Sequence, residues 1–339
     1  VGPSQAMPGV LGTSVPKENN STLRTRGWEI SLNWKHALEN GLSYNLGISL
    51  YDYKSVVTKY FNPTGTLSTW YEGAEVGDIW GYTVNDLFRS QEDLDSYLSK
   101  VDMTHIAANW NTGDLKYEDI NHDGKVNNGT NTIGNHGDLS VIGNDQPHYQ
   151  YTINGGVSYK GFDFSMLWRG VAKKDMYFYR GSNIYWGFMG GWWESCLTPE
   201  HLDYFRDQPG SKYSGLYEGD ANINTDAYWP RPYLNNTEEA KNKNHANTRY
   251  LQNAAYLRLQ NVQLGYSFPR SITSKMHLEK LRIYFSGENL LTFSKLPSGI
   301  DPVAPVGFPT GGEFFGTAGS GRLTYGADRI YSIGLTVTY

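Results

Sequence analysis

The last nine residues, YSIGLTVTY (331–339), raise the central question about the fold class. Apolar or aromatic side chains alternate in this stretch with small or polar ones, so a strand built from it has one apolar and one polar face. Nine residues are also about the length with which a tilted strand crosses the hydrocarbon core of a bilayer. A half-buried edge strand of a soluble β-sandwich would show the same alternation, so the rest of the sequence has to decide between the two interpretations.

The composition favours a large β-structure. The chain has 339 residues, 14% of them aromatic, with 26 Tyr and 10 Trp beside 38 Gly. This bias favours strands, tight turns and interface or sugar-facing surfaces over helix packing. We expect no transmembrane helix, because no run of about 18 consecutive apolar residues occurs. The net charge of −5 argues against nucleic acid as the main partner.

Six further segments show the same alternation, which predicts three hairpins ahead of the last strand. A change of phase near Gln260 and Asn261 predicts a β-bulge in the fifth segment. The predicted strands lie near 27–36, 42–54, 148–159, 162–171, 250–268, 280–293 and 329–339.

The connections between these strands alternate between short and long. Segments 57–147, 172–248 and 294–327 are far longer than the ordinary loops of a compact domain, whereas the turns inside the hairpins are short. Outer-membrane barrels have this asymmetry, with short periplasmic turns and long extracellular loops. The pattern therefore predicts that the short turns and Tyr339 lie at one end of the sheet. In the first long loop, Ser90 with Asp93 predicts the start of a short helix over 90–100.

Seven stretches carry a family resemblance when they are taken together and in order. They are RGWEISLNWK (26–35), WGYTVNDLFRSQEDL (80–94), GDLKYEDINHDGKVN (113–127), VIGNDQPHYQYTINGGVSYKGFDFS (141–165), AAYLRLQNVQLGYSFP (254–269), LRIYFSGENLLTF (281–293) and the terminal YSIGLTVTY. They look like the C-terminal part of the SusC/RagA-type TonB-dependent (TonB-linked) outer-membrane transporters of Bacteroidetes.

The resemblance implies an all-β fold, namely an antiparallel transmembrane β-barrel with long extracellular loops. Residues 1–339 would form the C-terminal portion, about the last third, of a 22-stranded barrel. The plug domain and the TonB box of the family have no counterpart in this sequence. The start VGPSQAMPGV has neither Met nor the features of a signal peptide, so we expect a fragment or a chain whose front is missing.

The resemblance also implies a function, which is not enzymatic. The protein would import a bulky nutrient, above all an oligosaccharide, across the bacterial cell outer membrane. A SusD-like surface lipoprotein would cover it, outer-membrane lipid would surround it, and the TonB complex would act through the missing N-terminal part. Three alternatives stay open: uptake of peptides by the same transporter type, a passive porin, and a secreted soluble β-rich protein that binds or hydrolyses glycans.

A possible calcium loop lies in DINHDGKVN (119–127), which has the first half of an EF-hand pattern. Its twelfth position is Thr130, which cannot supply the usual bidentate carboxylate, and the resemblance aligns Asp138 there instead. The loop would hold either a structural Ca²⁺ or an Asx-rich turn whose side chains bond the backbone. The candidate ligands are Asp119, Asn121, Asp123, Lys125 through its carbonyl, and Asp138.

Aromatic residues of the second long loop are the candidate substrate contacts. Indole and phenol rings can stack on sugar rings while charged and amide groups bond hydroxyls. The alternatives are an interface girdle, or packing of the loop or of the lipoprotein lid. The candidates are Trp186, Trp192, Trp193, Trp229 and Arg231.

Nothing in the sequence indicates catalysis. None of the eight His has a metal-ligand spacing such as HExxH, and adjacent carboxylates such as Glu238 and Glu239 point apart on regular structure. Cys196 is expected to be a free thiol. We predict no catalytic residue and no cofactor for transport.

Overall fold

The main element of the protein is one antiparallel sheet of seven strands. The computed structural model describes residues 19–178, 183–189, 197–213, 215–234, 236–303 and 326–339. The sheet order is β1-β2-β7-β8-β11-β12-β13. The strands are β1 (Thr22–Ala37), β2 (Ser43–Lys59), β7 (His148–Tyr159), β8 (Phe162–Lys173), β11 (Tyr256–Ser267), β12 (Lys280–Ser294) and β13 (Ile330–Thr338). Each segment in which the sequence predicts a strand overlaps one of them. The first strand begins earlier than predicted, at Thr22, the second ends later, at Lys59, and the fifth begins at Tyr256 rather than near 250.

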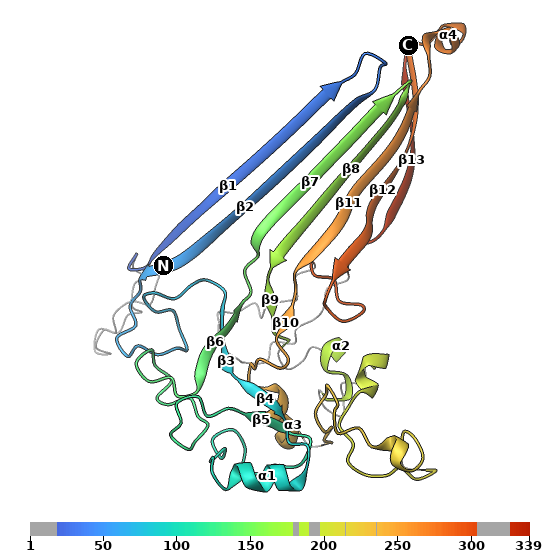
Figure 1. The fold of residues 1–339 in the computed structure, drawn as a ribbon. Coiled ribbons are helices and arrows are strands. Elements are labelled where there is room, and N and C mark those ends of the chain that lie inside the picture. Colours follow the sequence, from blue (N-terminus) through green and yellow to red (C-terminus); the bar gives the residue numbers. More distant parts are fainter. Residues whose placement is uncertain (1–18, 179–182, 190–196, 214, 235, 304–325) are drawn as a thin grey trace, which may run out of the picture.

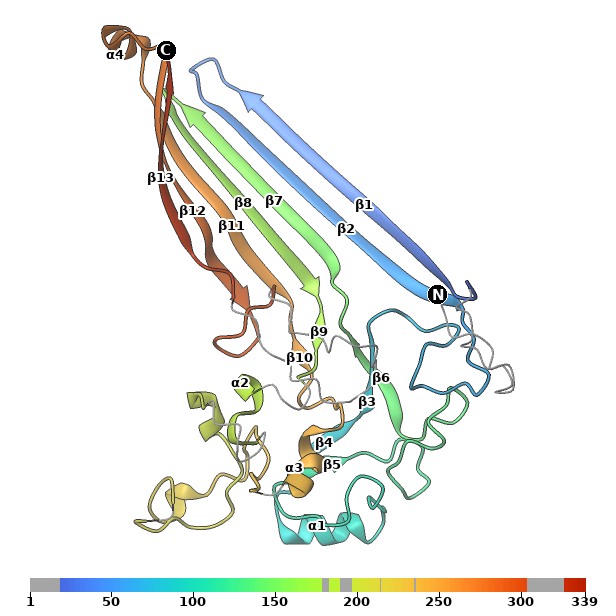
Figure 2. The same ribbon diagram turned by 180° about the vertical axis from the view of Figure 1, so that it is seen from behind.

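The two ends of the sheet differ as the sequence predicts. Figure 1 shows the β1–β2 and β7–β8 turns, the short helix α4 (Arg270–Thr273) and the C-terminus together at one end, which we call the turn end. The long connections gather at the other end, the loop end, and the view from behind in Figure 2 shows the same division. This arrangement fixes the direction of every strand.

The smaller elements belong mostly to the loop end. The short strands are β3 (Asp78–Tyr82), β4 (Val84–Leu87), β5 (Leu115–Tyr117), β6 (Leu139–Asn144), β9 (Asp175–Met176) and β10 (Gln252–Asn253). The remaining helices are α1 (Gln91–Leu98), α2 (Asn183–Trp186), α3 (Asn236–Lys243) and 3₁₀ turns at Gly187–Met189, Pro199–Leu202, Asp220–Asn222 and Ser274–Met276. In the described part of the chain, no helix has the length and apolar character needed to cross a membrane.

Two local predictions are confirmed. The Ser90 side chain caps α1 and accepts a hydrogen bond from the backbone N–H of Asp93 at 3.2 Å. The register of β11 shifts between Leu259 and Asn261 against both of its neighbours, which is the expected β-bulge.

The apolar side chains of the strands lie on a face that the described residues leave uncovered. Ile30 on β1 is 63% exposed and Ile333 on β13 is 79% exposed, and Phe285 and Leu264 on the strands between them are exposed as well. In a soluble sandwich such residues would be buried against a second sheet. A contiguous apolar surface of this extent is typical of a membrane or protein contact.

The opposite face of the sheet is polar and hydrogen-bonded across strands. On this face Arg282 of β12 donates to Asp163 of β8 at 3.0 Å and to Gln263 of β11 at 3.0 Å. Gly265 lies under this group, where a Cβ would collide with the guanidinium and the carboxylate. Three strands are thus joined by one charged cluster on the face that points away from the apolar surface.

The hydrophobic core lies in the loops and not in the sheet. A cluster of buried residues extends from Ile79 in the first long loop to Tyr250 at the end of the second. Its largest fully buried side chains include Phe88, Tyr117, Phe178, Tyr185, Trp186 and Tyr250. The loop end is therefore a folded unit, whereas the sheet relies on its surroundings to cover its apolar face.

The two faces of β13 can be compared at neighbouring positions. In the complete protein, we expect Ile333→Arg to impair membrane assembly, because a charge on the lipid face near the midplane costs about 2–4 kcal/mol. Ser332→Arg is the matched control, since Ser332 points to the polar face opposite Ser286. The folded fraction in outer membranes, measured by heat-modifiable gel mobility, should fall for the first variant alone. Equal yields for both would contradict the assignment of the faces.

Candidate functional site

The loop end is the candidate site, because the two longest loops are folded together there. The first loop contributes the pairs β3–β6 and β4–β5, and the second contributes β9–β10. A backbone bridge joins the loops directly, since the N–H of Tyr82 donates to the carbonyl of Ala246 at 2.9 Å. The two loops are therefore parts of one folded unit.

A buried ion pair also joins the two loops. The ammonium of Lys241 on α3 lies 2.7 Å from the carboxylate of Asp114 in the first loop, and both side chains are fully buried. The other oxygen of Asp114 accepts hydrogen bonds from Tyr233 at 2.8 Å and Asn242 at 2.9 Å. The ring of Trp110 flanks the ammonium at 5.7 Å. Removal of one partner would leave an uncompensated buried charge and would destabilise the joined loops.

Arg231, a predicted substrate contact, is partly exposed and makes its polar contacts within the protein. Its guanidinium donates to the carbonyl of Thr112 at 2.6 Å and to the Thr112 hydroxyl at 2.7 Å, and it pairs with Asp207. Burial alone would raise the pKa of Asp207, but the Thr112 hydroxyl and the Arg231 charge outweigh it and hold this pKa below its usual value. In this arrangement Arg231 connects the two loops.

Trp186 and Trp229, also predicted as substrate contacts, are buried. They are 0% and 3% exposed, and their rings lie 5.8 Å apart in a tilted, edge-on arrangement. The indole N–H of Trp186 donates to the carbonyl of Phe178 at 2.7 Å, and that of Trp229 donates to the carbonyl of Glu200 at 3.1 Å. In this structure both rings pack inside the loops, as the loop-packing alternative expects, and their contact with a substrate stays a prediction. Trp192 and Trp193 lie outside the described residues.

The predicted calcium loop is closed by hydrogen bonds to its own backbone. The structure brings Asp138 to the loop, where its buried carboxylate accepts from the N–H groups of Ile120 at 2.9 Å and Asn127 at 2.8 Å. Asp119 accepts from the N–H of Gly124 at 2.8 Å.

The remaining predicted ligands follow the same pattern. Asn121 accepts from the N–H of Asp123 at 2.9 Å, and Asp123 accepts from the N–H of Lys125 at 2.9 Å. This is the arrangement of an Asx-rich turn. Among the described residues, no group of three or more His, Cys, Asp or Glu is placed to hold a metal ion. Calcium binding at this loop stays a prediction.

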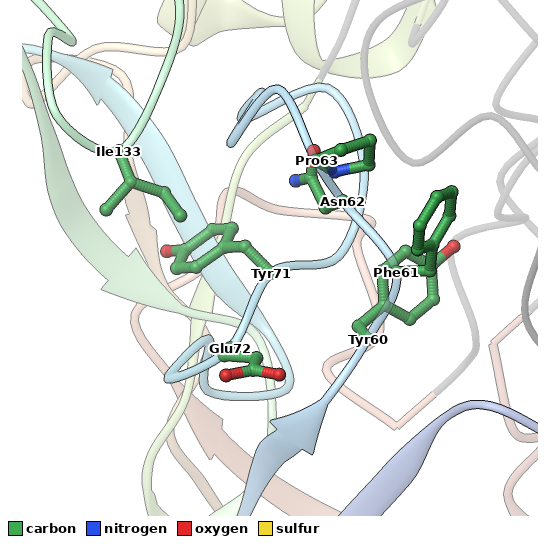
Figure 3. A pocket seen from close by; sticks show the side chains of 7 residues that line it. All are labelled: Tyr60, Phe61, Asn62, Pro63, Tyr71, Glu72 and Ile133. Atoms are coloured by element: carbon green, nitrogen blue, oxygen red, sulfur yellow. The ribbon is translucent and has the colours of Figure 1, made fainter.

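The structure contains a pocket that the sequence did not indicate. A pocket of about 340 Å³ opens in the first long loop, just beyond the end of β2 (Figure 3). It combines aromatic, aliphatic and amide side chains with one carboxylate. The residues that line it are Tyr60, Phe61, Asn62, Pro63, Tyr71, Glu72 and Ile133. Because Ile133 is far from the other six in the sequence, no local pattern could have indicated it.

The link between Asp207 and Arg231 should depend on pH. A carboxyl whose folded-state pKa is lowered stabilises the fold above its unfolded pKa, and this contribution is lost as the pH falls through the folded value. We expect Asp207→Asn to increase hydrogen exchange at the Arg231 amide at neutral pH by an amount equivalent to about 1 kcal/mol. The difference from the parent should diminish as the pH falls below about 3.9, the usual pKa of an aspartate. Asp220→Asn, at an exposed position of the same loop, is the control; a difference that persists in acid would contradict this account.

Two variants in residues 119–138 distinguish the Asx-rich turn from a calcium site. We expect Asp138→Ala to destabilise this loop by about 2–3 kcal/mol with or without calcium, because buried backbone amides lose their acceptor. Asp123→Asn keeps an acceptor oxygen but removes a charge that Ca²⁺ requires. If Ca²⁺ binds, it will raise the Tm of the complete protein, and Asp123→Asn will abolish that rise. A Tm that is independent of Ca²⁺ would refute the calcium prediction.

The chain is similar in sequence to curated proteins of Formosa agariphila. TonB-dependent receptor P3 is 23% identical over 317 residues, which cover 88% of this chain and 27% of that receptor. TonB-dependent receptor P26 is 24% identical over 357 aligned residues, which cover 97% of this chain and 31% of that receptor. The chain thus spans about three tenths of the length of these relatives. No family model matches the sequence.

Solved structures share the fold. A chain of the RagAB peptide transporter superimposes with a TM-score of 0.59 at 17% identity, covering 98% of this chain and 31% of that chain. The RagAB peptide importer in its open-open state gives a TM-score of 0.58 at 16% identity and covers 98% of this chain and 30% of that chain. These proteins are receptors and transporters, which fits the lack of a catalytic pattern in the sequence. Sequence and fold therefore agree that the chain is similar to TonB-dependent receptors and shares the fold of part of the RagAB transporter.

Proposed function

We propose that the chain is the C-terminal part of the barrel of a transporter that imports a bulky nutrient across the outer membrane with energy from TonB. The observation that carries this proposal is the uncovered apolar face of the seven-stranded sheet, combined with long connections at one end only. The apolar face would contact lipid and the polar face would line the lumen. The plug and the TonB box would belong to the rest of the complete protein.

In this proposal the protein makes and breaks no bond. The loop end would face the outside and contribute to substrate capture, and the turn end would face the periplasm. Because the two long loops are joined by buried contacts such as Lys241 with Asp114, they would move as one body when the transporter opens. Arg231 and the core tryptophans would shape this body without touching the substrate.

A SusD-like surface lipoprotein is the proposed partner at the loop end. Support comes from apolar side chains that the second long loop exposes. Tyr213 is 90% exposed and Leu234 is 87% exposed, and Tyr217 and Ile223 of the same loop are exposed as well. Exposed aromatic and aliphatic residues on a folded loop are typical of protein contacts.

We propose an oligosaccharide as the first candidate cargo, because aromatic side chains are abundant in the long loops. A peptide is the second candidate. It is supported by the likeness of the fold to the RagAB peptide transporter. Both cargoes are bulky and polar, so the transport mechanism would be the same.

Uptake by the complete protein tests this function. We expect deletion of the gene to abolish growth on one class of nutrient, either polymeric glycans or peptides, while growth on the corresponding monomers is unchanged. Restoration of growth should require the TonB box of the complete protein. Growth without that box would indicate a passive porin, and hydrolysis of glycans by the purified protein would indicate the soluble enzyme instead. Growth on glycans alone or on peptides alone would decide the cargo.

A further inference from the structure

The pocket in the first long loop has the composition of a site for an organic cation. Tyr60 and Phe61 form one side, and Tyr71 and Ile133 lie across from them, as Figure 3 shows. The carboxylate of Glu72 lies at the lower edge of the same space. A volume of about 340 Å³ is within the usual range of small-ligand sites.

Hydrogen bonds within the loop hold one wall of the pocket in place. The amide of Asn62 donates to the carbonyl of Thr66 at 2.8 Å and to that of Trp70 at 3.2 Å, and its oxygen accepts from the N–H of Thr66 at 3.1 Å. Asn62 therefore closes the turn and has little capacity left for a ligand. A wall that is already closed lowers the entropy cost of binding.

Hydrogen bonds to their hydroxyl groups also hold two of the aromatic rings in place. The hydroxyl of Tyr71 accepts from the indole N–H of Trp80 at 3.1 Å, and that of Tyr60 accepts from the hydroxyl of Thr69 at 3.2 Å. These contacts fix the polar tips of the two rings and leave their faces to line the pocket. Phe61, which is 41% exposed, has no polar atom to fix.

The charge of the pocket is negative. Glu72 is the one ionisable carboxylate among the lining residues, none of which is Lys, Arg or His. Within the described part of the chain Glu72 forms no ion pair, and the nearby Lys54 pairs with Glu75 instead. The faces of aromatic rings carry partial negative charge and attract cations.

We propose that this pocket binds a primary ammonium group attached to a compact organic moiety. The ammonium would bond to the carboxylate of Glu72, and the attached carbon atoms would pack against Tyr60, Phe61 and Tyr71. An amino sugar and the amino terminus of a peptide both present this chemistry. This binding proposal does not depend on import, so it stands even if the transport proposal fails.

Matched pairs of probes test the proposal with the complete transporter purified in detergent. The probes are trialanine and N-acetyl-trialanine, and glucosamine and N-acetylglucosamine; calorimetry measures their binding. We expect at least one free amine to bind, and its acetylated form to bind about tenfold more weakly or not at all, because acetylation removes the charge. The amine that binds identifies the source, peptide or amino sugar.

Variants link the binding to the pocket. Glu72→Gln should weaken the free amine about twofold to fivefold, as for loss of one partner of a partly exposed ion pair, and leave the acetylated form unchanged. Phe61→Ala should weaken both forms. Glu218→Gln, at an exposed position of the other long loop, is the control and should change neither. Equal binding of free and acetylated probes, no effect of Glu72→Gln in a protein with normal gel mobility, or no binding of either amine would overturn the proposal.

Discussion

In the hydrocarbon core of a bilayer, every backbone N–H and C=O group has to find its partner within the protein. The seven strands meet this requirement through continuous antiparallel pairing from β1 to β13. Side chains on the lipid side then have to be apolar and those on the other side can be polar, which yields the strict alternation of residues such as Ile333 and Ser332. The two edge strands still present unpaired backbone groups, so closure of a barrel needs strands beyond those of this sheet.

This constraint divides the stabilising interactions between two regions. Among the described residues the large buried cluster lies outside the sheet, so the apolar side chains of the sheet would depend on lipid to be removed from water. The loop end would lie outside the lipid, and the aromatic cluster around Trp186 and Tyr250 supplies its core. Each large side chain buried there contributes about 1.5–3 kcal/mol. The buried pair of Lys241 and Asp114 links the two loops directly, and the loss of either partner would leave a buried charge without this contact.

The sheet could be predicted from the sequence and most of the loop end could not. Alternation with a period of two is a local signal, so it indicated all seven strands, and the change of phase indicated the bulge at Leu259–Asn261. The cap at Ser90 is equally local. Contacts between distant loops leave no such signal: nothing in the sequence joins Asp114 to Lys241, or Thr112 to Arg231. A tryptophan in a Gly-rich and Tyr-rich segment also looks the same whether it faces a sugar or a core. The sequence therefore left substrate contact and loop packing open for Trp186 and Trp229, and the structure places both in the interior.

The central claim is that one face of the sheet contacts lipid, and spin-label accessibility along β13 measures this most directly. Single cysteines would replace residues 330–338 in turn in the complete protein, with Cys196 changed to Ser, and the labelled protein would be reconstituted in bilayers. We predict that collisions with oxygen, which dissolves in lipid, are high at Ile333, Leu335 and Val337, and that collisions with a water-soluble nickel complex are high at Ser332 and Thr336. Low collision rates with both reagents at Ile333, Leu335 and Val337, as in the core of a sandwich, would contradict the account.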